Sequence, residues 1–398
     1  MIIIDPTMII EKTPFTPEEA GYIPERIDAL NTHFMKLVDS GKLQGASYCL
    51  SRNSKVFALN AMGKLTNIEG DDRPLTPYSH NIVYSVTKLF CAAAIFTLVE
   101  DGFITLNQKV GEFIEEFNVP PFNEITIAHL LSHTSGMKPD SNCFDNPYDV
   151  YQWDYIKHDY DGGEENWIKS SLKAPPRSKP GDEWAYCTYG FAILGEIITR
   201  VSGTFAHEYI KQRLLIPCDM TESGFKECLT KEQASTLCIK YEREKELVHN
   251  IINDVIPNKE TLFWQGIPAT GSGLYSTLED LVKFGTMLMQ GGVYNGRQVM
   301  GRKTIEKMTA RYTSKDIKEY CYNAGGVERA YALGPDIRCS LYSLYTEGTY
   351  FHEGAGACCL MVDPFEKMVA AWFVPYSGSN WLSEALYNAS AIIWSGVK

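Results

Sequence analysis

Long apolar segments are missing from this 398-residue sequence, and so is the pattern of a secretory leader. No run approaches the roughly 18 apolar residues that a membrane-spanning helix needs. The first residues, MIIIDPTMIIEKTPFTPEE, lack the basic start and the small-residue cleavage site of a signal peptide. We therefore expect neither a membrane partner nor secretory targeting.

Paired cysteines and excess positive charge are also missing. The 11 cysteines include no CxxC pair, and their odd number does not suit a disulfide framework. Several lie in apolar segments, where a free thiol behaves as a small hydrophobic side chain (Cys49, Cys91, Cys358 and Cys359). That usage is typical of a reducing compartment, so we expect a cytoplasmic protein. The net charge of −12 disfavours nucleic acid or an anionic membrane surface as the main partner.

Two β-type runs follow a helical pattern near the start of the chain. Residues 16–40 carry the helical pattern, and a polar turn joins the runs GASYCLS (45–51) and KVFALNAMG (55–63). Runs of this kind with a short turn between them predict an antiparallel hairpin.

The pattern of apolar residues in the rest of the chain predicts a second lobe. It is mostly helical between residues 86 and 265, and after 270 it is mixed, with strands around 331–374 and a last helix over 381–395. If the early and late strands share a sheet, the helical part is an insertion, and a substrate cleft lies between the two lobes. We therefore predict an α/β (α+β) fold with two domains: residues 1–80 together with 270–398, and residues 81–269.

The residues Tyr84-Ser85-Val86-Thr87-Lys88 lead directly into an apolar helical run, LFCAAAIFTLVEDG. A serine and a lysine three residues apart at a helix start lie on one face, so the amine can reach the hydroxyl. A half-buried lysine can activate a serine nucleophile, and a helix N-terminus favours an oxyanion. The pattern indicates an active site. Its structural alternative is a serine near a helix start with a solvated lysine.

The same spacing occurs in two other places, at Ser135/Lys138 and Ser170/Lys173. A glycine directly follows the first serine, and two prolines stand just beyond the second lysine, so neither pair begins a long helix. Only Ser85 precedes a long apolar segment of the kind that forms a buried helix. The sequence therefore favours the Ser85 pair.

Three segments in order resemble the serine β-lactamase-like family, on the branch that holds class C β-lactamases, carboxylesterases and D-aminopeptidases. They are YSVTK with its helix, PGDEWAYCTYGFAILGEIITRVSG (180–203) and YFHEGAGACCLMVDP (350–364). LLSHTSGM and the segment 271–292 support the match. The resemblance implies an antiparallel sheet flanked by helices, a mostly helical second lobe and an active site between them.

The resemblance also implies roles for matching residues. Ser85 corresponds to the family's nucleophile and Lys88 to its partner. Tyr186 falls where the family has Tyr-x-Asn, and His352 falls where it has Lys-Thr-Gly or, in esterase-like members, His-x-Gly. These four residues are the expected catalytic set.

An oxyanion hole is implied at the backbone N–H groups of Ser85 and of Ala355, which follows Gly354. Each such donor contributes roughly 3–4 kcal/mol to the transition state. A nearby lysine favours the phenolate form of Tyr186, whose ordinary pKa is about 10. Either this phenol or Lys88 can then be the base for acylation, and the choice stays open because the two would titrate as a coupled pair.

Two residues depart from the family pattern. Thr188 replaces an asparagine that would bind the lysine and a substrate amide, and a threonine hydroxyl has a shorter reach. Glu353 places an acid at the edge of the site, where it disfavours substrates with their own carboxylate, such as β-lactams. The acids of the polar 140–166 loop act in the same direction or form a solvated surface, and the second reading is favoured.

We reject a metal site and expect no cofactor. His129 and His133 stand four residues apart and could nominally bind a metal on a helix. No HExxH acid accompanies them.

The expected function is that of a serine hydrolase that forms an acyl-enzyme on Ser85 with a small-molecule ester or amide. A carboxylesterase or a peptidase-type amidase is favoured over a β-lactamase. Acyl transfer to an alcohol or amine is a second enzyme hypothesis. The alternative from another class is a non-catalytic, penicillin-binding-like sensor, against which the intact set of Ser85, Lys88 and Tyr186 speaks. The sequence does not indicate an oligomeric state.

Overall fold

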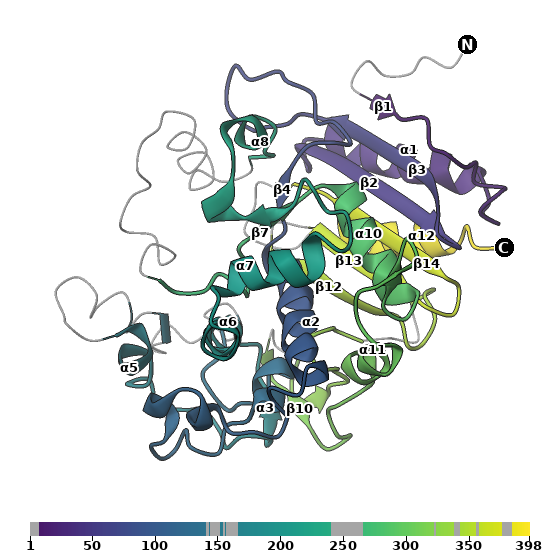
Figure 1. Ribbon diagram of the computed structural model, residues 1–398. Helices are drawn as coiled ribbons and strands as arrows, with labels where there is room; N and C mark the ends of the chain where they lie inside the picture. The colour runs from purple at the N-terminus through teal and green to yellow at the C-terminus, as the bar shows by residue number, and fades with distance from the viewer. Residues whose placement is uncertain are drawn as a thin grey trace, which may run out of the picture.

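The largest sheet among the described residues of the computed structural model has six antiparallel strands (Figure 1). The structure describes residues 8–140, 143, 152–153, 156, 166–239, 266–321, 324–337, 343–355, 358–375 and 384–398. The strand order is β1 (Met8–Ile10), β3 (Lys55–Gly63), β2 (Gly45–Arg52), β14 (Met368–Phe373), β13 (Cys358–Asp363) and β12 (Tyr350–Gly354). Strands from the two ends of the chain therefore share one sheet, and the predicted mixed α/β fold with a flanked antiparallel sheet is confirmed.

The predicted hairpin over 45–63 is present as β2 and β3. Their register runs from Gly45 opposite Gly63 to Arg52 opposite Lys55. The two turn residues Asn53 and Ser54 have φ values of 54° and 61°, as a tight two-residue hairpin turn requires.

Each face of the sheet carries its own helices and core. Side chains alternate along β2, so Tyr48 and Leu50 join one core while Cys49 joins the other. Helices α1 (Glu25–Asp39) and α12 (Ala389–Trp394) pack on the first face. Helix α10 (Leu278–Met289) packs on the opposite face, over β14, β13 and β2.

Helix α2 (Thr87–Glu100) is buried on all sides and connects this second core to the helical part of the molecule. Every residue from Thr87 to Leu98 is buried, which is why the sequence is apolar all round instead of amphipathic. Helix α6 (Thr188–Ser202) packs against α2, and α3 (Ile127–Leu131) packs against α6 (Figure 1).

Helices lie in most of the places where the periodicity predicts them. Within the region predicted to be helical, α6 begins at Thr188, and Gly203 ends it in the left-handed conformation with φ 71°. The other α-helices among the described residues are α5 (Trp167–Ser171), α7 (Ala206–Ile210), α8 (Lys231–Ser235) and α11 (Arg302–Thr309). Across the described residues, no helix has the length and apolar character to cross a membrane.

Two small sheets cross the predicted domain boundaries. In one, β4 (Asn81–Ile82) and β6 (Gly224–Phe225) both pair with β7 (Leu274–Ser276). In the other, β5 (Glu183–Trp184) pairs with β10 (Lys318–Glu319), which pairs with β11 (Val327–Glu328). The division into 1–80 with 270–398 and 81–269 stays a prediction.

Candidate active site

Ser85 lies in a 3-10 turn, Tyr84–Val86, that links β4 to α2. Tyr84 has a φ of 44°, in the left-handed region that a bulky residue rarely adopts. Such strained backbone persists only where the surrounding structure holds it, and it clusters at functional sites. The turn sets Ser85 one helical turn before Lys88, as the spacing predicts.

Lys88 is fully buried, and its Nζ has three oxygen partners. It lies 3.0 Å from Ser85 Oγ, 3.0 Å from Thr188 Oγ1 and 2.9 Å from the carbonyl oxygen of Gly271. Its side chain is 0% exposed, and burial lowers its pKa to about 8, against the opposing charge of Asp140. The solvated-lysine alternative is therefore wrong.

Asp140 joins the site through Thr188. Its two carboxylate oxygens accept from the Thr188 backbone N–H at 2.8 Å and from the Thr188 hydroxyl at 2.6 Å. Its own backbone N–H donates to the carbonyl of Tyr186 at 2.8 Å. Burial raises the pKa of this carboxyl, while Lys88 and the Thr188 bonds oppose the rise.

Tyr186 also meets Ser85. The Ser85 side chain acts on the phenol and lowers its pKa, and the ring centroid lies 4.9 Å from Lys88 Nζ. Burial first, and then the nearby Tyr331 and Asp140, raise the pKa of the phenol well above its usual value. The expectation that Lys88 favours a phenolate is therefore wrong, because desolvation disfavours the charged phenolate more strongly. Tyr186 is a neutral phenol.

His352 lies beside Tyr186 on β12, with ring centroids 6.2 Å apart. Its Nδ1 is 2.7 Å from the carbonyl oxygen of Glu353, and its Nε2 is 3.5 Å from the Tyr331 hydroxyl. Strand alternation directs the Glu353 side chain to the opposite face of the sheet from His352. The structure thus brings His352 to the wall of the site, with Glu353 as its strand neighbour.

Close backbone contacts require glycine at two positions. A Cβ at Gly354 would overlap the carbonyl oxygen of Val83 and the sulfur of Cys358, so β12 lies directly against the turn that carries Ser85. A Cβ at Gly271 would lie 2.7 Å from Thr188 Cγ2, and its absence lets the carbonyl reach Lys88. Ala355 follows β12 in an exposed turn, and its part in an oxyanion hole stays a prediction.

The two other Ser-x-x-Lys matches lie in different settings. Helix α5 ends at Ser171, before Lys173, as the prolines predict. Ser135 is buried, and its hydroxyl accepts from the Met137 backbone N–H at 3.4 Å. Most of the 140–166 loop, with its acids from Asp145 to Glu165, lies outside the described residues.

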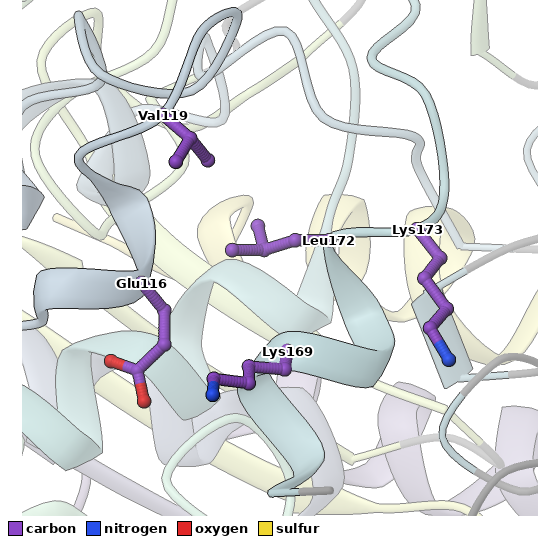
Figure 2. A pocket seen from close by; sticks show the side chains of 5 residues that line it. All are labelled: Glu116, Val119, Lys169, Leu172 and Lys173. Atoms are coloured by element: carbon purple, nitrogen blue, oxygen red, sulfur yellow. The ribbon is translucent and has the colours of Figure 1, made fainter.

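A surface hollow of about 300 Å³ lies between α5 and the segment before residue 120 (Figure 2). None of its lining residues belongs to the Ser85 cluster; they are Glu116, Val119, Lys169, Leu172 and Lys173. In the part of the chain that the structure describes, no group of three acidic, histidine or cysteine side chains is arranged for a metal ion.

The sequence did not indicate two hydrogen-bond partners in this cluster: Asp140, which binds Thr188, and Gly271, which binds Lys88. Asp140 stands three residues after the supporting segment LLSHTSGM, but its contact with Thr188 spans 48 positions and has no local signal. Gly271 opens the segment 271–292, but a backbone carbonyl leaves no trace in the residue type.

Comparison with known proteins identifies the family of this chain. A family model described as Beta-lactamase matches residues 29–390. This chain belongs to the Beta-lactamase family. Among curated proteins, Protein Rv1367c of Mycobacterium tuberculosis is 21% identical over 378 residues, covering 88% of this chain and 90% of that protein.

Solved structures share the fold of this family member. The hydrolase EstCE1, described as having promiscuous acyltransferase activity, has a TM-score of 0.71 at 15% identity and covers 94% of this chain and 98% of its own. A class C β-lactamase has a TM-score of 0.71 at 16% identity, with coverage of 94% and 97%. At these identities the likeness establishes the fold alone.

Proposed function

We propose that this member of the Beta-lactamase family is a serine hydrolase that cleaves small esters or amides through an acyl-enzyme on Ser85. The observation that carries the proposal is the fully buried Lys88, with its amine 3.0 Å from the Ser85 hydroxyl and a pKa lowered to about 8. A lysine that loses its proton near neutral pH is a base of suitable strength for a serine nucleophile.

In the first step, the Ser85 hydroxyl gives its proton to Lys88 Nζ while Oγ bonds to the substrate carbonyl carbon. The carbonyl oxygen becomes an oxyanion, for which the backbone N–H groups of Ser85 and Ala355 are the proposed donors. Tyr186, a neutral phenol beside Ser85, donates its proton to the leaving oxygen or nitrogen as the bond between the carbonyl carbon and that leaving atom breaks. The Lys88 ammonium then returns a proton to Tyr186.

Water completes the reaction. Lys88, neutral again, takes a proton from the water that attacks the acyl carbon, and it passes that proton to Ser85 Oγ as the acyl–oxygen bond breaks and the carboxylic acid leaves. We propose that His352 packs beside Tyr186 at the edge of the site, where its Nε2 lies 3.5 Å from the Tyr331 hydroxyl.

Esters and simple amides suit this site better than β-lactams. The Thr188 hydroxyl, which replaces the family asparagine, is already engaged by Lys88 and Asp140. Threonine also lacks the side-chain amide that asparagine would offer a substrate. The Asp140 carboxylate behind it disfavours an anionic ligand.

Mutation of Ser85 tests the proposal. Ser85→Ala is expected to abolish p-nitrophenyl acetate hydrolysis and labelling by a fluorophosphonate probe, because the attacking oxygen is gone. Undiminished turnover in the mutant contradicts the proposed acyl-enzyme. Failure of the wild-type protein to label with any acylating probe favours a non-catalytic sensor.

A substrate panel distinguishes the remaining enzyme hypotheses. Short acyl esters, D-amino acid amides and nitrocefin separate esterase, amidase and β-lactamase activity. The structural neighbour EstCE1 is described as a hydrolase with acyltransferase activity, so added alcohols and amines belong in the assay. Free acid as the sole product rules out efficient acyl transfer.

We also propose that the protein works in a reducing compartment such as the cytoplasm. Ten cysteines lie among the described residues, all are free thiols, and nine of them are buried. Free buried thiols are typical of proteins kept under reducing conditions.

A further inference from the structure

The oxygen neighbours of Lys88 Nζ determine where the amine hydrogens point. Asp140 contributes by fixing the hydroxyl hydrogen of one of these neighbours, Thr188. The carbonyl oxygen of Gly271 only accepts, so Lys88 donates one hydrogen there at 2.9 Å. The carboxylate of Asp140 also only accepts, and it takes the single hydroxyl hydrogen of Thr188 at 2.6 Å. Thr188 Oγ1 can then only accept from Lys88, at 3.0 Å.

A neutral amine has two hydrogens and one lone pair. Both hydrogens are engaged by Gly271 and Thr188, so the lone pair faces the third neighbour, the Ser85 hydroxyl at 3.0 Å. We infer that Asp140 is a positioning residue: by holding the Thr188 hydroxyl hydrogen, it directs the lone pair of Lys88 toward the proton of Ser85. The inference rests on the proposed function, because it concerns the base of that reaction.

The packing around Thr188 supports this role. Asp140 is tied at three points, with its carboxylate on the Thr188 N–H and hydroxyl and its own N–H on the Tyr186 carbonyl. The carboxylate therefore cannot rotate away without breaking the start of α6. No aspartate in this position was expected from the sequence, and it accompanies the threonine that replaces the family asparagine.

Asp140 also acts on the charge of Lys88. It is the first of the ionisable groups that raise the lysine pKa against burial, ahead of the cysteines. Among the described residues, the other ionisable or polar side chains that act on or contact Lys88 are Cys91, Cys143, Cys187, His133, Tyr186, Ser85 and Thr188. Burial raises the pKa of Cys91 and Cys187 to about 12, raises that of Tyr186 and lowers that of His133, so these four stay neutral near pH 8.

Asp140→Asn separates the positioning role from a structural one. Asparagine can still accept the Thr188 backbone N–H through its side-chain oxygen. Its NH₂ group then meets the Thr188 hydroxyl as a donor, so the hydroxyl hydrogen turns toward the Lys88 lone pair. We expect kcat/KM for p-nitrophenyl acetate to fall about 100-fold or more, the usual scale of general-base catalysis. The acid limb of the pH profile should move to lower pH, because the charge that raises the lysine pKa is lost.

Asp280→Asn is the matched control. Asp280 is a buried carboxylate on α10 that likewise accepts a serine hydroxyl, from Ser223 at 2.8 Å, and a backbone N–H, from Glu222 at 2.9 Å. It has no contact with Lys88, so this mutant should keep the wild-type pH profile.

Variants of Thr188 provide a second test of the positioning role if Asp140→Asn does not fold. Thr188→Val removes the hydroxyl with little change of shape and should lose a similar factor in kcat/KM. Thr188→Ser keeps the hydroxyl and should recover at least tenfold over the valine variant.

The proposal requires both a fall in rate and a moved acid limb in Asp140→Asn. A fall without movement of the limb, or a wild-type rate, overturns it and leaves Asp140 as a structural partner of the first residue of α6. Equal rates in the Thr188 valine and serine variants overturn it as well. Turnover that persists in Ser85→Ala overturns the proposed function instead, so the two failures are distinguishable.

Discussion

At the scale of single residues, burial controls the chemistry of the Ser85 cluster. Lys88 and Tyr186 are both desolvated, and desolvation favours the neutral form of each: the lysine pKa falls to about 8 and the tyrosine pKa rises. The amine becomes a base near neutral pH and the phenol becomes a donor. In the proposed reaction, burial therefore favours Lys88 over Tyr186 as the group that accepts the Ser85 proton.

The activity should follow the titration of Lys88. Its folded-state pKa is lowered, so the neutral, basic form grows as the pH rises through about 8. We expect kcat/KM for a p-nitrophenyl ester to rise nearly tenfold per pH unit below pH 8 and to level off above it. Steady-state rates between pH 6 and 9.5, corrected for spontaneous hydrolysis, measure this. A profile that is flat from pH 6 to 9 contradicts Lys88 as the base.

At the scale of elements, the site depends on how closely β12 approaches the turn before α2. Gly354 makes that approach possible, because any side chain there would meet the Val83 carbonyl and Cys358. The thiol of Cys358 also donates to that same carbonyl at 3.0 Å, which fixes the strand pair against the turn. The sequence shows the His-x-Gly pattern, but only the packing explains why its glycine is needed.

Gly354→Ala should separate β12 from the Ser85 turn. We expect kcat/KM to fall roughly tenfold or more and the free energy of unfolding to fall by about 1–3 kcal/mol, as for other overpacked sites. Urea denaturation and ester hydrolysis on the same preparation measure both.

Gly190→Ala is the control for that change. A Cβ at Gly190 in α6 meets Leu130 at an ordinary 3.5 Å, and alanine is the better helix former. This variant should be as stable as the wild type or more so. Equal behaviour of the two mutants would show that β12 does not need the close approach.

At the scale of the whole molecule, the two ends of the chain stabilise one another. The Tyr22 hydroxyl donates to the carbonyl of Ile393 at 2.7 Å, and the Trp394 indole donates to Asp363 at 3.0 Å. Trp394 is 5% exposed and belongs to the core that covers the face of the sheet opposite α2. This core is separated from Ser85 by the sheet itself, so stability and chemistry should respond to different mutations.

Trp394→Ala tests that separation. Loss of a buried aromatic should lower the free energy of unfolding by about 3–5 kcal/mol. The fluorophosphonate labelling rate per folded molecule should stay within about twofold of the wild type without denaturant. Tyr387→Ala, at a side chain that is 55% exposed, should change stability by no more than about 0.5 kcal/mol. A large loss of labelling in folded Trp394→Ala would show that the two cores are coupled.

The sequence by itself determined what depends on neighbours along the chain. The hairpin over 45–63, the buried helix after Ser85 and the pairing of Ser85 with Lys88 follow from turn residues, apolar periodicity and a three-residue spacing. Tertiary structure decided what depends on residues far apart in sequence. Thr188 meets Asp140 across 48 positions and Lys88 meets Gly271 across 183, and neither contact has a local signal. The same packing removes water from Lys88 and Tyr186, and desolvation, a property of the folded interior, lowers the pKa of the lysine and raises that of the tyrosine.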